Sequence, residues 1–239
     1  MRQITDNVYV FPFMAGFINV YLIETHDGLL LSDTGTSPAQ MDRVLNDLQK
    51  SGRKAEDIKH IFITHAHNDH IGGLNHLQKI LPLTTRTYAH RREAAIIRGE
   101  APMIFPPKEE LGWLMGAMRS RMPTHVNVPA RVDSEVKEGD KIAGLLEVVE
   151  LPGHAYGQCG LWWKERGILF GGDVMVRFLW GLARPFRVAS PDQKAVIASI
   201  KKVAAMNLKM LCVCHGAPLT QNTAATIQTF ADRFSLDSN

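Results

Sequence analysis

The sequence predicts a layered α/β protein, and three observations support this prediction. Short apolar segments typical of strands alternate with amphipathic segments typical of helices in the first third of the chain. The same alternation returns in the last hundred or so residues. The chain has 239 residues, of which 45% are hydrophobic and 21% charged, so a single domain over residues 1–239 can bury a sizeable core.

The first third of the chain predicts strands followed by a helix, a further strand and a second helix. Ser37-Pro38 begins a pattern in which apolar residues recur at helical spacing as far as Gly52. A strand at 61–63 is followed by a helix over 71–80. The other predicted strands of this part are 8–11, 19–23 and 29–31.

Residues 91–125 interrupt this alternation, and we expect them to form a helical insertion. The stretch 101–122 is rich in methionine, proline and large apolar side chains. It could form a packed helical hairpin or a lid over a substrate. The two interpretations are compatible, because methionine adapts both to gaps in a core and to varied ligands.

The last third again predicts strands and helices. A helix over 191–206 carries its apolar residues on one stripe, a buried strand follows at 211–214, and a final helix covers 220–234. The strands expected before these elements are 141–143, 145–149, 159–163 and 167–170.

Charge and composition argue against several classes of protein. Lysine and arginine outnumber acidic residues by 27 to 24, and no basic stripe suggests nucleic-acid binding. No apolar stretch reaches the roughly 18 residues of a membrane span, and the N-terminus lacks the pattern of a secretory signal. Three cysteines do not suggest a disulfide framework, and Cys212 and Cys214 fit a buried strand. We therefore expect a cytoplasmic protein with no membrane partner.

A cluster of four potential metal ligands directly follows the strand predicted at 61–63. It consists of His65, His67, Asp69 and His70. Imidazole and carboxylate are the usual non-thiolate ligands of zinc, and the spacing of the first two histidines lets their rings point the same way after a strand. Histidines can lie on a solvated turn and the aspartate could simply cap a helix, but the combination indicates a metal site.

Three further candidate ligands each follow an apolar segment and have a glycine as neighbour. They are His154, Asp173 and His215. Strand ends at one edge of a sheet converge in space, and glycine allows the backbone to approach a ligand closely. Each residue alone could be an ordinary loop, turn or cap residue. Their repeated pattern makes them candidates for the same metal site.

The ordered motifs HxHxDH, Pro-Gly-His, Gly-Asp and His-Gly resemble those of the metallo-β-lactamase superfamily, from Asp33 to His215. The resemblance implies an αββα sandwich with two metal ions at one edge. It also implies a role for each ligand: His65, His67 and His154 hold the first metal, Asp69, His70 and His215 hold the second, Asp173 bridges the two, and Asp33 braces the histidines without binding metal.

Such a site implies a hydrolase. Two divalent ions about 3.5–4 Å apart lower the pKa of a shared water toward neutrality, so that a bridging hydroxide becomes the nucleophile. Asp173 would neutralise part of the paired charge, and Asp69 could orient the hydroxide or pass a proton. Two Zn²⁺ ions suit these donors best, although Mn²⁺ or Fe²⁺ would also be accepted.

Positions outside the ligand set narrow the expected substrate. β-Lactamases of this fold generally lack the bridging aspartate, so Asp173 counts against that main activity. Quorum-quenching lactonases place a tyrosine where Val176 stands, which puts a dedicated homoserine lactonase in doubt. The expected substrate is a small-molecule carboxylic ester, thioester or lactone. Its apolar portion would contact residues 101–122 and Trp180.

Tyr156, Arg177 and Trp180 are the candidate substrate-binding residues. Tyr156 could supply a hydroxyl or only pack, Arg177 could instead pair with a surface acid, and Trp180 could belong to the core. Other functions remain open, namely a β-lactamase or phosphoester hydrolase using the same site, or a non-catalytic metal-binding scaffold. All seven ligand residues that the resemblance implies are present, which disfavours a non-catalytic scaffold. The sequence also leaves a homodimer open.

Overall fold

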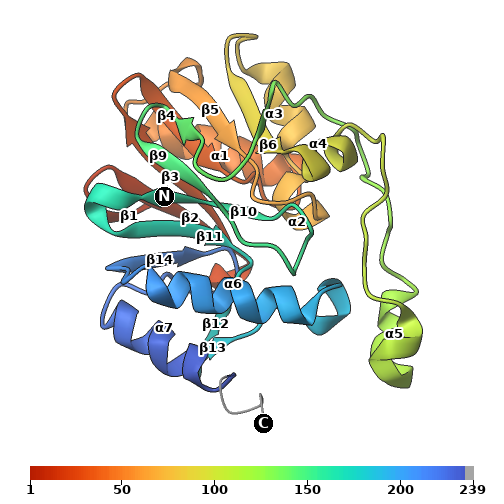
Figure 1. Cartoon of the computed structure of the whole chain (residues 1–239). Coiled ribbons are helices and arrows are strands. Elements are labelled where there is room, and N and C mark those ends of the chain that lie inside the picture. Colours follow the sequence, from red (N-terminus) through yellow and green to blue (C-terminus); the bar gives the residue numbers. More distant parts are fainter. Residues whose placement is uncertain (235–239) are drawn as a thin grey trace.

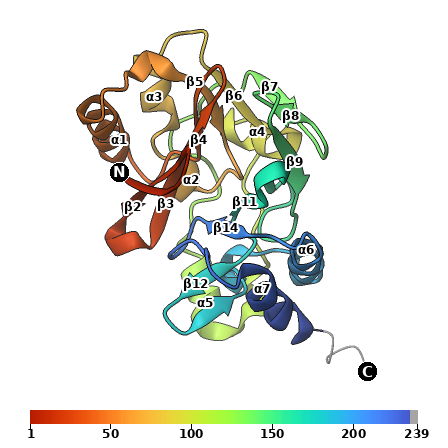
Figure 2. The same ribbon diagram turned by 90° about the vertical axis from the view of Figure 1, so that its left-hand side faces the viewer.

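Two β-sheets face each other and carry helices on their outer sides, as the computed structural model in Figure 1 shows. The structure describes residues 1–234. Helices α1 (Pro38–Lys50) and α3 (Leu74–Ile80) cover the first sheet. Helices α6 (Gln193–Ala205) and α7 (Thr223–Asp232) cover the second, and Figure 2 shows the two helical layers on opposite sides. The αββα sandwich expected from the sequence is confirmed.

The first sheet has seven strands in sequence order. Its first four strands pair antiparallel and the rest parallel. Parallel neighbours need a crossover, and α1 and α3 supply it between successive strands. The strands are β1 (Arg2–Thr5), β2 (Val8–Phe13), β3 (Ile18–Thr25), β4 (Gly28–Ser32), β5 (Ile58–Phe62), β6 (Arg86–His90) and β7 (Ser134–Val136).

The second sheet has five strands in the order β14-β11-β10-β9-β8. All neighbours pair antiparallel except β11 and β14, which are parallel and connected through α6. A separate hairpin follows β11. The strands are β8 (Lys141–Ile142), β9 (Leu146–Glu150), β10 (Cys159–Trp163), β11 (Ile168–Gly172) and β14 (Met210–Val213), and the hairpin consists of β12 (Val176–Phe178) and β13 (Gly181–Ala183).

Strand β3 illustrates why the sequence of a central strand is apolar without interruption. Val20 and Leu22 pack in the core beneath α1, whereas Tyr21 and Ile23 pack between the two sheets. A strand buried on both faces loses the alternation of polar and apolar residues that a half-exposed strand shows. Burying each such aliphatic side chain contributes about 1.5–3 kcal/mol. Because the central strands are held by packing on both faces, the strand ends that carry the site are fixed in position.

Most predicted elements overlap observed ones, with bounds that differ by a few residues, and the larger differences occur at short or interrupted segments. The helix expected over 71–80 is divided into α2 (Asn68–Ile71) and α3. The division follows from hydrogen bonds to a neighbouring loop: the carbonyl of His70 accepts from Thr34 N, and Gly72 N donates to Gly35 O. The sequence analysis missed five short strands, β1, β6, β7, β12 and β13.

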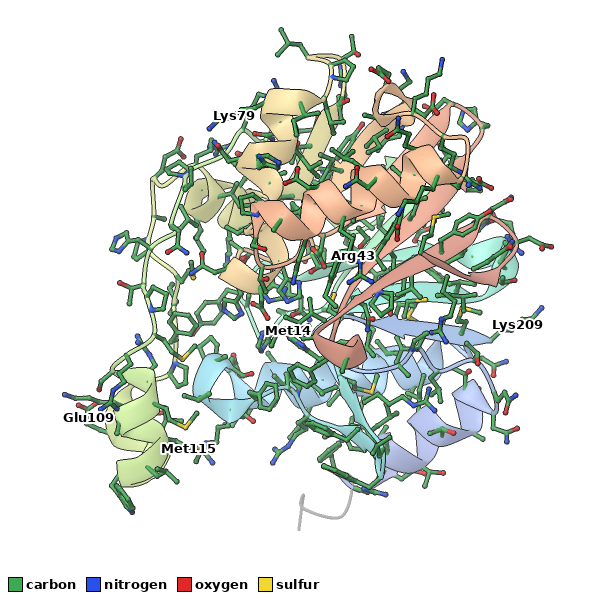
Figure 3. The ribbon with its side chains drawn as sticks, turned by 180° about the vertical axis from the view of Figure 1, so that it is seen from behind. Met14, Arg43, Lys79, Glu109, Met115 and Lys209 are labelled. Carbon is green, nitrogen blue, oxygen red and sulfur yellow. The ribbon has the colours of Figure 1, made fainter. Side chains whose placement is uncertain are left out.

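The packed helical hairpin considered for residues 101–122 is wrong. Helix α4 (Arg91–Ile97) lies beside β6, whereas α5 (Gly112–Arg119) lies at the end of an extended arm, against the 3₁₀ turn η5 (Arg187–Ala189). Figure 3 shows this arm standing away from the sheets, marked by the labels of Glu109 and Met115. Prolines 102, 106 and 107 lie between the two helices and prevent a continuous helical connection.

Among the described residues, no helix combines the length and apolarity that crossing a lipid bilayer requires. The three cysteines, Cys159, Cys212 and Cys214, are free and buried. Burial raises the pKa of the Cys212 thiol, which agrees with the expectation that the strand cysteines pack in the core.

Replacing Gly153 by alanine is expected to destabilise the fold more than replacing Gly139. Both glycines have a positive φ, +130° and +83° respectively. A Cβ added at Gly139 would have no atom of residues 1–234 beyond its chain neighbours within 4 Å. A Cβ added at Gly153 would lie 2.8 Å from the carbonyl carbon of Ala195 in α6. We expect a loss of about 1 kcal/mol for Gly139→Ala and at least about 3 kcal/mol for Gly153→Ala in urea unfolding. Equal losses would contradict this packing explanation.

Candidate metal centre

The seven candidate ligands converge at one edge of the sandwich, where four strands end. His65 to His70 follow β5, and His154 follows β9. Asp173 comes directly after β11, and His215 comes shortly after β14. Because the strands are held by the core on both sides, their ends place these side chains together although up to 150 residues separate them in the sequence.

The first group consists of three imidazoles. The Nδ1 atom of His67 lies 3.0 Å from Nε2 of His65 and 3.0 Å from Nε2 of His154. Three imidazoles that bind one cation have their ring nitrogens facing one another at about this separation. All three residues can offer a ligand atom within 4.8 Å of the others.

The second group consists of Asp69, His70 and His215. Asp69 Oδ2 lies 3.3 Å from His215 Nε2 and 3.8 Å from His70 Nε2. These atoms also lie within 4.8 Å of one another. The two histidines are buried, whereas about a third of the aspartate side chain is exposed, so this group faces the solvent side of the site.

Asp173 contacts both groups. Its Oδ2 atom lies 3.3 Å from Nε2 of His154 in the first group and 3.0 Å from Nε2 of His215 in the second. Its Oδ1 atom lies 3.5 Å from Nε2 of His70. The carboxylate therefore occupies the position between two ligand groups that the family resemblance implies for a bridging residue.

Two buried polar atoms at this centre fit a metal site. His70 Nε2 and Asp173 Oδ1 are buried and have no hydrogen-bond partner among the described residues. Leaving such groups unpaired in a protein interior is unfavourable by about 1–3 kcal/mol each. Because the donors are imidazole and carboxylate atoms, a divalent cation coordinated by them would satisfy both.

The protonation states of the first ligand group suit a cation. Burial lowers the pKa of His67 to about 3 and that of His154 to about 4, so both rings are neutral with a lone pair free for coordination. Burial alone would raise the pKa of Asp173, but the charges of His215 and His70 hold it well below its usual value. Burial opposes protonation of His215, yet the charge of Asp173 raises the pKa of that ring to about 10.

The outer nitrogen of three ligand histidines has its own partner. His154 Nδ1 lies 2.9 Å from Ser190 Oγ, and His215 Nδ1 lies 3.0 Å from the carbonyl oxygen of Phe17. His65 Nδ1 lies 3.2 Å from Thr64 Oγ1. Such contacts set the orientation of a ligand ring and decide which nitrogen faces the metal.

Asp33 lies behind His70 rather than in either ligand group. Its Oδ2 atom is 3.0 Å from His70 Nδ1, and Cys214 Sγ donates to the same oxygen. The other carboxylate oxygen accepts from the backbone N–H of Thr64, next to the first histidine of the motif. The residue is buried, and its carboxylate connects the ligand segment after β5 with the ligand segment after β14.

A cleft of about 510 Å³ opens onto both ligand groups, and we refer to it as the metal cleft. One wall contains ligand side chains, including His67, Asp69 and His215. The rest of the lining is mainly apolar, and we call it the apolar wall. Its main side chains are Met103, Phe105, Met118, Met122, Phe186 and Val188, most of them from the arm that ends in α5.

The three candidate substrate-binding residues lie around the metal cleft, but within residues 1–234 none of them lines it. Tyr156 borders a neighbouring cavity beside His67. Arg177 directs its guanidinium to the carbonyl oxygens of Ala217 and Pro218, so it holds the loop after His215. Trp180 is 81% exposed, which excludes the core alternative, and it stacks on Phe178 with ring centroids 4.8 Å apart.

Asp33 was expected from the family resemblance to brace the histidines, and it is the partner of His70 Nδ1, but the partners of the other three outer nitrogens were not predicted from the sequence. Thr64 could have been found, because its hydroxyl directly precedes the first ligand of the motif. Ser190 gives no local signal, since 36 residues separate it from His154. Phe17 acts through its backbone carbonyl, which any residue would provide.

Comparison with known proteins agrees with this geometry. The profile of the metallo-beta-lactamase superfamily matches residues 14–215. The chain belongs to this superfamily. The HxHxDH motif that first suggested the family corresponds to the cluster from His65 to His70, at the edge of the sandwich.

Three similar proteins illustrate the range of the superfamily. The probable metallo-hydrolase YflN of Bacillus subtilis (strain 168) is 25% identical over 238 residues, 91% of this chain and 88% of that protein. The acyl-coenzyme A thioesterase MBLAC2 of Gallus gallus is 34% identical over 123 residues, 47% of this chain and 40% of that protein. The crystal structure of TTHA1623 in a di-iron-bound form superposes with a TM-score of 0.66 at 24% identity, covering 93% of this chain and 99% of that one.

Replacing Asp173 by alanine is expected to lower the metal content by about one ion per chain, because it removes a carboxylate that contacts both ligand groups. Stability of the metal-free protein should change far less. Elemental analysis after dialysis measures the content, with Asp42→Ala as control, since Asp42 pairs with His76 on the surface. Unchanged metal content would rule out the bridging position.

Replacing Ser190 by alanine is expected to weaken metal binding by about 10–100-fold, because the ring of His154 loses the partner that orients it. Competition with a chromogenic chelator measures this affinity. Ser51→Ala, at the C-terminal end of α1, removes a hydroxyl that donates to Leu48 O and accepts from Arg53, and it should have no effect on metal binding. Equal affinities for the two variants would show that the Ser190 contact does not orient the ligand.

Proposed function

We propose that this protein is a dinuclear zinc hydrolase that cleaves a carboxylic ester, thioester or lactone with an apolar portion. One observation supports this proposal above all others. Asp173 lies between two groups of imidazole and carboxylate donors, in a cleft whose remaining lining is mainly apolar. A polar reaction centre facing an apolar wall suits a substrate that has a carbonyl group on an apolar body.

The bound ions would supply the chemistry of a dinuclear site, namely a shared hydroxide nucleophile and a Lewis acid for the substrate carbonyl. The protein holds the imidazole and carboxylate donors in place and sets the net charge of the centre. Asp173 and Asp69 contribute negative charge at the centre, and the exposed part of Asp69 faces the cleft, where it can orient a water or accept a proton. The apolar wall limits the access of other water to the reacting groups.

The apolar wall favours carbon esters and thioesters over phosphoesters. Phosphoryl substrates are negatively charged, and proteins usually bind them with basic side chains. The apolar wall consists mainly of methionine and phenylalanine side chains. The similarity to an acyl-coenzyme A thioesterase supports an acyl substrate. Zinc is our choice of metal because of the donor types, and the di-iron form of a similar structure makes iron the main alternative.

The test reconstitutes the metal-free protein with zinc and measures hydrolysis of an ester, a thioester, a lactone, a β-lactam and a phosphodiester. We expect two ions per chain and chelator-sensitive hydrolysis of the ester or thioester. Asp173→Ala should lower kcat by at least about 100-fold, because it removes a residue that touches both ligand groups. Iron and manganese loading of the same preparation compares the metals.

Three results would contradict this proposal. Turnover of only the β-lactam or only the phosphodiester would assign a different reaction to the same site. Two bound ions without turnover of any substrate would indicate a metal-binding scaffold. Hydrolysis that survives removal of the metal would show that the ligand groups are not the reaction centre.

A further inference from the structure

A second cavity, which we call the side cavity, adjoins the metal cleft. Its volume is about 490 Å³, within the range of small-molecule sites. It shares two lining residues, His67 and Met103, with the metal cleft. Because His67 belongs to the first ligand group, a ligand in the side cavity lies directly beside the proposed reaction centre.

The lining of the side cavity is apolar except near its rim. Ala95 and Ile96 of α4 form one side, and residues 101–104 of the arm form another. The carboxylate of Glu93 is buried here, but each of its oxygens already accepts a hydrogen bond from the backbone. Arg92 is exposed and lies 5.9 Å from the ring of Tyr156, which is also partly exposed. The interior therefore suits a chain without polar atoms.

We propose that the side cavity binds the unbranched acyl chain of the substrate, while the carbonyl group lies at the metal centre. This assignment rests on the proposed function and makes it more specific, since it predicts a preference for medium-length acyl groups. The apolar wall of the metal cleft is then left for the leaving group. Tyr156, at the rim, contacts the outer part of the chain.

The test compares nitrophenyl acetate, butyrate, hexanoate and octanoate as substrates. We expect kcat/KM to rise with acyl length, by up to about fourfold per methylene. Ala95→Phe places a ring in the side cavity and is expected to lower the ratio of kcat/KM for octanoate over acetate by at least about tenfold. Ala205→Phe adds the same ring at an exposed position of α6 and should leave the ratio unchanged.

Equal kcat/KM values for the four esters, or a ratio that Ala95→Phe does not change, would overturn the assignment. If no ester, thioester or lactone is hydrolysed, the proposed function fails and binding alone tests the cavity. A fluorescent fatty acid titrated into the metal-free protein should then bind wild type and Ala205→Phe more tightly than Ala95→Phe. Equal binding to all three proteins would overturn the assignment in that case too.

A separate observation concerns Glu93, a buried carboxylate on α4 that the proposed chemistry does not use. Its Oε2 atom accepts from the backbone N–H of Ala66, 2.8 Å away, and its Oε1 atom accepts from the backbone N–H of Gly157, also 2.8 Å away. Burial raises the pKa of this carboxyl, and the two backbone hydrogen bonds act in the opposite direction. The side chain is 2% exposed.

The two segments that Glu93 connects carry the whole first ligand group. Ala66 lies between His65 and His67, and Gly157 lies three residues after His154. The loop of Gly157 passes so close that an added Cβ would lie 2.8 Å from Glu93 Oε1. One side chain thus fixes the distance between two loops that are distant in the sequence.

The geometry points to Glu93 as a positioning residue for the first metal. It acts through the backbone of both loops and not by contact with the ion or the substrate. Glutamine has one carbonyl oxygen, which can still accept from one backbone N–H, but its NH₂ group cannot accept from the other. Glu93→Gln therefore breaks one of the two connections while keeping the size of the side chain.

We expect Glu93→Gln to weaken binding of one of the two zinc ions by about 10–100-fold in chelator competition, the range known for partners that orient ligands. Glu100→Gln, at an exposed position that pairs with Arg98, is the matched control and should bind both ions as wild type does. Thermal unfolding of the metal-free variants separates folding from metal binding.

A lower unfolding temperature of metal-free Glu93→Gln with unchanged zinc affinity would show a purely structural role and overturn the inference. Equal weakening of both ions would also overturn it, because the two backbone groups that Glu93 contacts, Ala66 N and Gly157 N, lie next to ligands of the first group. If Glu93→Gln does not fold, Gly157→Ala, which pushes the second loop away from the carboxylate, is measured in the same way and must weaken the same ion.

Discussion

A single buried carboxylate determines how the rest of this structure is arranged. Asp173 faces imidazoles from three loops, those of His70, His154 and His215, at 3.0–3.5 Å. A charge buried this completely is tolerated only where opposite charge and hydrogen bonds compensate it. The convergence of the histidine loops supplies part of that compensation, and bound cations would supply the rest. The same requirement therefore holds the loops together and creates the proposed reaction centre.

The two-sheet core makes this convergence possible. Ligand loops begin at the ends of strands whose side chains are packed on both faces, so their first residues cannot move far. Asp33 then joins two of these segments, through Thr64 and His70 after β5 and through Cys214 after β14. The group that holds the outer nitrogen of a ligand histidine need not be a polar side chain of a recognisable motif, since the partner of His215 is the backbone carbonyl of Phe17. Rigid supports of this kind are what a site needs to hold cations at a fixed separation.

The metal donors and the apolar contacts come from different parts of the fold. The donors belong to the sandwich, whereas the apolar wall comes mainly from the arm between α4 and β7. Loops carried by a rigid scaffold can vary without loss of the core, so an arm of this kind can change the substrate while the chemistry is kept. His67 and Met103 border both the metal cleft and the side cavity, and they mark where the two parts meet.

The sequence by itself determined the features that depend on neighbouring residues. The central strands, α1 and the cluster from His65 to His70 were predicted because periodicity and local ligand spacing record them. Tertiary structure alone decided what depends on distant contacts. It broke the helix after His70 through bonds to Thr34, placed α5 on an extended arm, and turned Arg177 toward a backbone loop and away from the cleft. Such contacts join residues far apart in the chain, and no local pattern specifies them.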